Sequence, residues 1–181
     1  MESPSLVFSA WNVYYTLMGT SASALTGLTF VIISLMSDSQ RRTTTDGVSA
    51  FSTPTVVHFT AALMLSVVLC VPWPLLLWPA TFLALAGTIG VSYQCRIMFI
   101  TLRFTSYDPD IEDWIWYTIL PIVAYAAVLG GAVGLGYAPA RASYAPALGV
   151  ALLLLIGIHN SWDVVTYITI KDRNTTEEAN Q

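Results

Sequence analysis

Charge is what this sequence has least of. Only 10% of its 181 residues are charged, whereas 55% are hydrophobic, and soluble domains carry about 25% charged residues. A water-exposed surface needs charged side chains to stay dispersed, so the composition excludes an ordinary soluble domain. The net charge of −4, together with the lack of a basic patch interleaved with aromatic residues, excludes a nucleic-acid partner.

Residues and motifs of familiar enzyme chemistry are also scarce. The chain has only two histidines and two cysteines. It has no phosphate-binding glycine loop, no G-x-S-x-G turn and no His-Glu-x-x-His pair. Two cysteines do not make a disulfide framework, and Cys70 and Cys95 are expected at different membrane depths. The N-terminus lacks the positive segment of a cleaved signal peptide. We therefore expect a protein that is not an enzyme.

What the sequence does contain is a series of long apolar segments separated by short polar stretches. Each has about 18–25 residues, which at about 1.5 Å per residue is enough to cross a hydrocarbon core about 30 Å thick. No alternation with a period of two appears, and an open sheet edge cannot face lipid. The sequence predicts an all-α bundle of five transmembrane helices in one domain, 1–170, followed by a polar cytoplasmic tail, 171–181. The helices are expected at about 12–36, 54–71, 79–102, 114–137 and 146–170.

The basic residues predict how these helices are oriented. If consecutive helices alternate in direction, only Arg141 of the seven lysines and arginines lies on one side. Because basic residues accumulate on the cytoplasmic side, we expect the N-terminus outside, the C-terminus in the cytoplasm, and a location in the cell (inner) membrane. The six residues on the cytoplasmic side are Arg41, Arg42, Arg96, Arg103, Lys171 and Arg173.

Local patterns predict details of individual helices. Thr53 is expected to cap the second helix, just before Pro54. Asp110, with Asp113 three residues later, predicts a cap on the fourth helix, where acidic groups also favour the helix dipole. Pro121 removes one backbone donor inside that helix, so it should free the carbonyl of Tyr117 and bend the chain.

Small residues recur every four positions in the first and fourth segments. Lipid supplies no hydrophobic drive between helices, so small residues that let backbones approach favour helix contact. We expect these two ridges to pack the monomer together, with a homo-oligomer interface as the alternative. The ridges consist of Gly19, Ser23 and Gly27, and of Ala126, Gly130 and Gly134.

Polar residues at membrane depth are the candidate functional site. Counted at about 1.5 Å per residue, Asp163 lies about 12 Å and Arg96 about 10 Å inside the cytoplasmic ends of their helices. Unpaired charges at such depths are costly, so we predict an Arg96–Asp163 ion pair. The predicted polar cluster comprises His58, Tyr93, Arg96, His159, Asn160 and Asp163, with Tyr117 as a further candidate.

Three interpretations of this cluster remain open. The cluster lines a path for protons, ions or a small solute, since intramembrane ionisable groups often mark pathways and histidine titrates near neutral pH. Alternatively, it is a structural network in an accessory or assembly subunit of a larger membrane complex. Thirdly, His58, His159 and Asp163 bind haem or a metal ion; otherwise no cofactor is expected.

Overall fold

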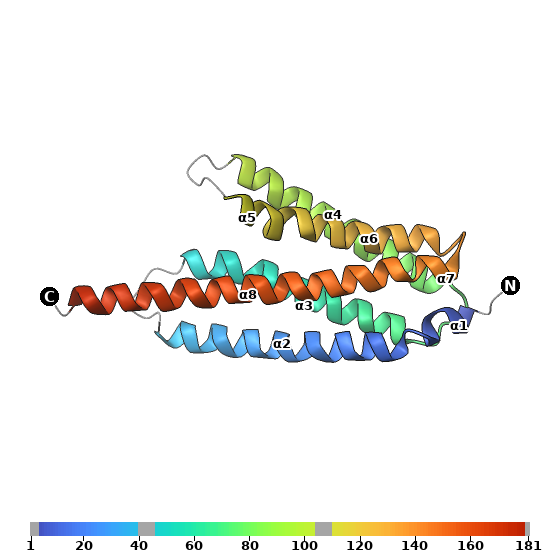
Figure 1. Cartoon of the computed structure of the whole chain (residues 1–181), viewed down its shortest axis with the longest axis horizontal. Helices are drawn as coiled ribbons and strands as arrows, with labels where there is room; N and C mark the ends of the chain where they lie inside the picture. Colours follow the sequence, from blue (N-terminus) through green and yellow to red (C-terminus); the bar gives the residue numbers. More distant parts are fainter. Residues whose placement is uncertain (1–3, 40–45, 104–109, 180–181) are drawn as a thin grey trace.

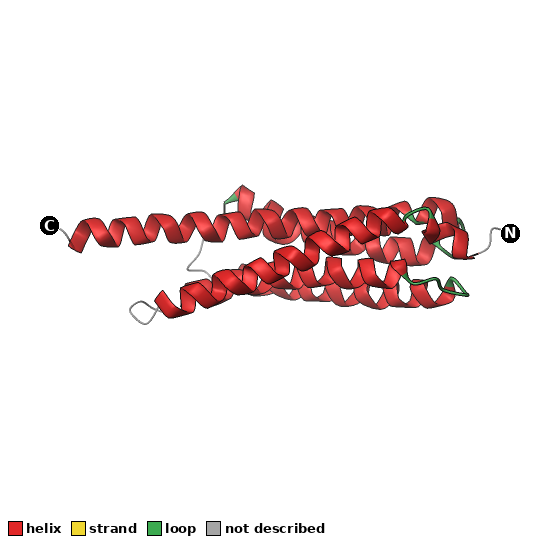
Figure 2. Ribbon diagram, turned by 90° about the horizontal axis from the view of Figure 1, so that it is seen from below, coloured by secondary structure: helices red, strands yellow, loops and turns green. Residues whose placement is uncertain are grey.

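The structure is entirely helical in its regular elements. The computed structural model describes residues 4–39, 46–103 and 110–179, and no strand occurs among them (Figure 1). Figure 2 shows the same bundle from below, with the helices running roughly along one axis. The helices are α1 (Pro4–Ser9), α2 (Asn12–Ser39), α3 (Asp46–Cys70), α4 (Leu77–Arg103), α5 (Ile111–Trp114), the π-helix η2 (Ile115–Ile119), α6 (Leu120–Gly134), α7 (Pro139–Ala142) and α8 (Tyr144–Ala179).

Within these described residues, four stretches are long and apolar enough to cross a membrane. The apolar part of α3, Pro54–Cys70, is shorter. Large apolar side chains are exposed along the stretches, for example Val13 on α2 and Ile89 on α4. In water such a surface would drive association, whereas lipid tails solvate it. The four stretches are Asn12–Ser34, Leu77–Arg103, Ile111–Gly134 and Pro139–Asp163.

The helices pack in an order different from their order in the chain. α3 packs between α2 and α8, and α6 packs between α8 and α4. Figure 1 shows α4 and α5 diverging from α8 at the end where α8 leaves the bundle. α1 and the end of α8 lie at opposite ends of the molecule. Because α6 separates α4 from α8, polar residues on those two helices do not meet directly.

Two predicted helix boundaries are wrong. α3 begins at Asp46 and contains Pro54, so Thr53 does not cap it; proline leaves one carbonyl without a donor but does not end this helix. α8 continues to Ala179, through most of the segment predicted as a tail. Residues 171–179 contain no glycine or proline, and lysine, arginine and glutamate favour helices.

The start of the fourth segment follows its sequence signals. The backbone N–H of Ile111 donates to the Asp110 carboxylate at 2.7 Å, and the N–H of Asp110 donates to Asp113 at 3.3 Å. This capping box confirms the predicted cap. One turn later the backbone hydrogen bonds change from four-residue to five-residue spacing: the N–H of Leu120 donates to the carbonyl of Ile115, five residues back.

This π turn, η2, ends two residues before Pro121. A proline has no N–H to donate to the carbonyl four residues earlier, here that of Tyr117. A local change from four-residue to five-residue spacing is one way a helix accommodates such a gap. The disturbance predicted at Pro121 is therefore a π turn in this structure.

Glycines hold the central helices at close range. A Cβ on Gly87 of α4 would lie 2.8 Å from the backbone nitrogen of Leu129 on α6. One on Gly149 of α8 would lie 2.8 Å from the carbonyl oxygen of Ala124 on α6. Only a missing side chain allows backbones to approach so closely. These contacts set the spacing of α4, α6 and α8.

The small-residue ridge of α2 is only partly used inside the monomer. Gly19 is buried, and a Cβ there would lie 3.0 Å from the Cβ of Ser66 on α3. Ser23 and Gly27 are exposed, and a Cβ on Gly27 would meet nothing within 4 Å. Of the three ridge residues, only Gly19 therefore packs inside the monomer.

The ridge of α6 behaves in the same way. Ala126 and Gly130 are exposed, and a Cβ on Gly130 would meet nothing within 4 Å. A Cβ on Gly134 would lie 2.9 Å from the Cβ of Ala142 in α7. Most of this ridge faces away from the bundle, and the predicted homo-oligomer interface remains a prediction for that face.

Candidate functional site

His159 occupies the most chemically distinctive surroundings in the bundle. It lies on α8, and the indole ring of Trp116 from η2 stacks on its imidazole, with ring centroids 3.7 Å apart and planes 6° from parallel. Its Nε2 atom lies 3.6 Å from Oε1 of Glu112, and its Nδ1 atom lies 3.3 Å from Oδ2 of Asp163. Each ring nitrogen thus faces a different carboxylate.

Four-residue spacing on two helical segments brings these side chains together. His159 and Asp163 are four residues apart on α8 and share one face. Glu112 and Trp116 are also four residues apart, across the junction of α5 and η2. Tyr117, the next residue of η2, donates its hydroxyl to Oδ2 of Asp163 at 3.3 Å. We call these five residues the His159 cluster.

Exposure is graded across the His159 cluster. The side chain of Glu112 is 73% exposed, that of Asp163 40%, and that of His159 21%. The contact between His159 Nδ1 and Asp163 is close, but Nδ1 makes no aligned hydrogen bond with any described residue, so we treat it as an electrostatic contact. The two carboxylates are therefore nearer to the protein surface than the imidazole is.

Glu112 is a member of this cluster that sequence reasoning missed. The sequence predicts a helix cap from Asp110 and Asp113, which the structure confirms, and it assigns no role to Glu112 between them. Its position four residues before Trp116, on the same face of the helix, is the available signal. Because several acidic residues stand together at the start of this helix, the sequence does not indicate which of them faces another helix.

The predicted Arg96–Asp163 ion pair is wrong. Among the residues that the structure describes, Asp163 contacts His159 and Tyr117, and Arg96 is exposed on α4. The rise per residue predicts that both residues lie at a similar membrane depth. It does not predict which side of each helix the side chain is on. α6 lies between the two helices and keeps the pair apart.

The other predicted cluster residues lie elsewhere in the bundle. His58 is buried on α3, and its Nδ1 lies 3.1 Å from the hydroxyl of Tyr125 on α6. Asn160 is fully buried on α8, and neither atom of its amide has a hydrogen-bond partner among the described residues. Tyr93 is partly buried on α4. The single predicted cluster is therefore divided into an exposed part around His159 and a buried part that includes His58.

The predicted metal or haem ligands do not form a common set. In the described ranges, no three side chains of histidine, cysteine, aspartate or glutamate are arranged to hold a metal ion. His58 faces a tyrosine, and the two nitrogens of His159 face separate carboxylates. Of the expected ligands, the structure brings together His159 and Asp163 alone.

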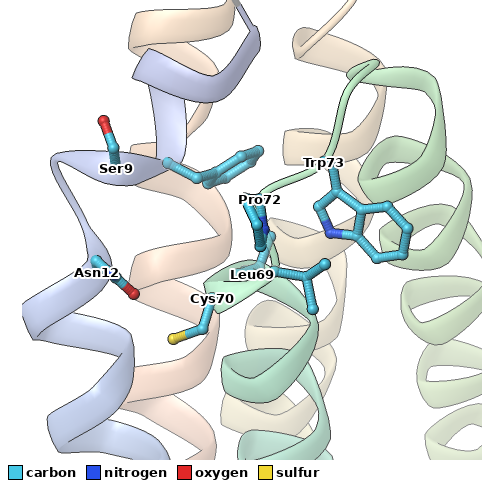
Figure 3. Close-up of a pocket in the computed structure, with 8 residues that line it drawn as sticks. Ser9, Asn12, Leu69, Cys70, Pro72 and Trp73 are labelled. Atoms are coloured by element: carbon cyan, nitrogen blue, oxygen red, sulfur yellow. The ribbon is translucent and has the colours of Figure 1, made fainter.

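A small cavity lies at the opposite end of the bundle (Figure 3). Its volume is about 80 Å³, and α1, the start of α2 and the turn after α3 surround it. Asn12 and Cys70 bring polar atoms to one side of it, and the indole of Trp73 lies on the other side of Pro72. The thiol of Cys70 also lies 3.8 Å from the hydroxyl of Thr16. The sequence alone does not predict this cavity, because its walls come from separate segments of the chain.

The fold, with four helices long and apolar enough to cross a membrane, defines a helical multipass membrane protein. Comparison of the chain with models of known protein families, with curated proteins and with solved structures finds no match.

Proposed function

We propose that the chain crosses the membrane five times, with its N-terminus outside and its C-terminus in the cytoplasm of a cell (inner) membrane. The apolar part of α3, Pro54–Cys70, is about 26 Å long at 1.5 Å per residue, close to the hydrocarbon thickness. α3 packs between α2 and α8, both of which contain candidate spans. The basic residues at the α8 end support a cytoplasmic location for that end.

In this orientation the protein passes protons, as a channel or transport-type protein, and the His159 cluster is its cytoplasmic proton site. One observation carries the proposal: the imidazole of His159 lies between the carboxylates of Glu112 and Asp163. An imidazole accepts a proton at one nitrogen and releases one from the other. Glu112 and Asp163, whose side chains are both more exposed than that of His159, exchange protons with water and pass them to the imidazole.

Buried polar groups support a hydrated continuation from this site. Asn160 follows His159 directly, and its amide has no partner among the described residues. Toward the other end of the bundle, the hydroxyls of Ser66 and Tyr15 are also buried without a described partner. Such groups are costly in an apolar interior unless water meets them. Water at these positions would supply the missing hydrogen-bond partners.

The alternative is an accessory or assembly subunit of a membrane complex, in which the same contacts are structural. The stacking of Trp116 on His159 and the hydrogen bond from Tyr117 to Asp163 both tie η2 to α8. Such ties stabilise the bundle whether or not a proton moves. If the protein passes protons, the loss of one ionisable group should lower proton flux. If the contacts are structural, the same loss should lower stability, and no flux is expected from the wild type.

Proton flux into liposomes tests the proposal. The purified protein is reconstituted with a pH-sensitive dye inside the vesicles, and flux is driven by a potassium diffusion potential. We expect wild-type vesicles to acidify faster than protein-free ones. His159→Gln and Asp163→Asn should lower the rate to near that of protein-free vesicles, because each variant interrupts the row of ionisable groups.

Arg141→Gln is the matched control, since Arg141 is exposed on α7, at the other end of the bundle. It should leave the rate unchanged. Melting temperatures of all variants in detergent separate the two functions. Wild-type vesicles no leakier than empty ones, or a His159→Gln rate equal to wild type, would refute proton passage. A large loss of stability in Asp163→Asn without any wild-type flux would support the accessory role.

A further inference from the structure

Two arginines share an exposed face of α4. Arg96 and Arg103 are seven residues apart, which is two helical turns, and both are exposed. The guanidinium carbon of Arg103 lies 4.1 Å from the centre of the Phe99 ring. Because Phe99 is one turn nearer to Arg96, the Arg103 side chain folds back along the helix toward Arg96. The Arg103 guanidinium therefore lies over the exposed Phe99 ring, and Arg96 is three residues before that ring on the same helix.

No described protein group neutralises these charges. Neither arginine forms an ion pair in the described part of the chain. The carboxylates that follow α4 are occupied elsewhere: Asp110 and Asp113 form the capping box, and Glu112 faces His159. Asp108 lies outside the described residues. Two positive charges on one helix face repel each other when no counter-charge lies between them, so they favour an anion from outside the protein.

Depth in the membrane indicates which anion is available. The candidate span Leu77–Arg103 has its middle near residue 90. Arg96 then lies about 9 Å and Arg103 about 20 Å from the bilayer centre, and the hydrocarbon boundary is about 15 Å from it. An arginine just inside this boundary extends its aliphatic stem along apolar surface and places its guanidinium among the headgroups. Phosphate groups of lipids occupy that level.

We infer that Arg96 and Arg103 bind the headgroup of an anionic phospholipid against the outer face of α4. A guanidinium presents paired N–H donors that match the oxygens of a phosphate. The exposed side chains of Ile100 and Leu102 offer an apolar surface to the acyl chains. This inference depends on α4 alone and stands independently of proton passage through the His159 cluster.

Native mass spectrometry of the full-length protein tests this site. The protein in mild detergent is titrated with phosphatidylglycerol or with phosphatidylcholine of the same acyl chains. Each basic residue near an anionic lipid surface contributes about fivefold in affinity. We expect wild type to prefer phosphatidylglycerol. The preference should fall about fivefold in Arg103→Gln and about 25-fold in Arg96→Gln/Arg103→Gln.

Two further variants keep the test decisive. Arg141→Gln removes one positive charge at the other end of the bundle and should keep the full preference. Arg96→Lys/Arg103→Lys preserves charge and serves if the double glutamine variant fails to fold; it should keep part of the preference. Equal binding of both lipids to wild type would overturn the inference, as would an equal loss in Arg141→Gln. Displacement of phosphatidylglycerol by equimolar inorganic phosphate would overturn its assignment to a lipid.

Discussion

Gly87 on α4 offers a quantitative test of how the bundle packs. In the Gly87→Ala variant the new methyl group would lie 2.8 Å from the Cβ and backbone nitrogen of Leu129 and 2.9 Å from its Cα. Ordinary contact begins near 3.4 Å, so α4 and α6 must separate by about 0.6 Å. The obstacle is mostly backbone, which cannot rotate away as a side-chain tip can.

The expected loss follows from two opposing terms. Overpacking a well-packed interface costs about 1–3 kcal/mol, while replacing a helical glycine by alanine returns up to about 1 kcal/mol. The net destabilisation is about 1–2 kcal/mol, which corresponds to a melting temperature lower by about 2–8 °C for a chain of this size. Thermal unfolding of the purified protein in detergent, followed by circular dichroism, measures it.

Gly27→Ala is the matched control, because a Cβ on Gly27 meets nothing within 4 Å. It should raise the melting temperature by about 1–4 °C through helix propensity alone. If Gly87→Ala melts at or above the wild-type temperature, the close contact between α4 and α6 is refuted. An equal loss in both variants would show that glycine is needed for another reason.

Two further predictions concern a buried hydrogen bond and the exposed ridge of α6. Tyr125→Phe removes the hydroxyl that faces His58 and should destabilise the protein by about 1–3 kcal/mol. Tyr137→Phe is the control and should be neutral, because that side chain is 87% exposed. Equal melting temperatures of the two variants would contradict a buried hydrogen bond. Gly130→Leu should fold normally and, if the ridge joins copies of the chain, lower the mass measured by light scattering to that of a monomer. A monomeric wild type would contradict the homo-oligomer.

Much of the local structure could be predicted because it depends on short stretches of sequence. The capping box of Asp110 and Asp113 needs residues only three positions apart. A disturbance at Pro121 follows from a missing backbone donor. The boundaries at Thr53 and residue 170 failed because Pro54 is tolerated inside a helix and because a charged segment continued α8 where a tail was expected.

The candidate site could be predicted only in part. His159 and Asp163 were grouped correctly, since both lie on one helix at a spacing of four. The partners of these residues come from η2 and α5, and no local pattern distinguishes Glu112 from the acidic residues around it. Arg96 was predicted to face Asp163, but it is exposed on α4, and α6 lies between α4 and α8.

By itself the sequence determined that the chain is helical and apolar enough for repeated membrane crossing, because length, hydropathy and caps are properties of a single segment. The tertiary structure decided which faces meet. A membrane helix is apolar on nearly all sides, so hydropathy does not separate the face toward lipid from the face toward protein. Only the packing order, with α6 between α4 and α8, brings Glu112 to His159 and leaves Arg96 facing outward.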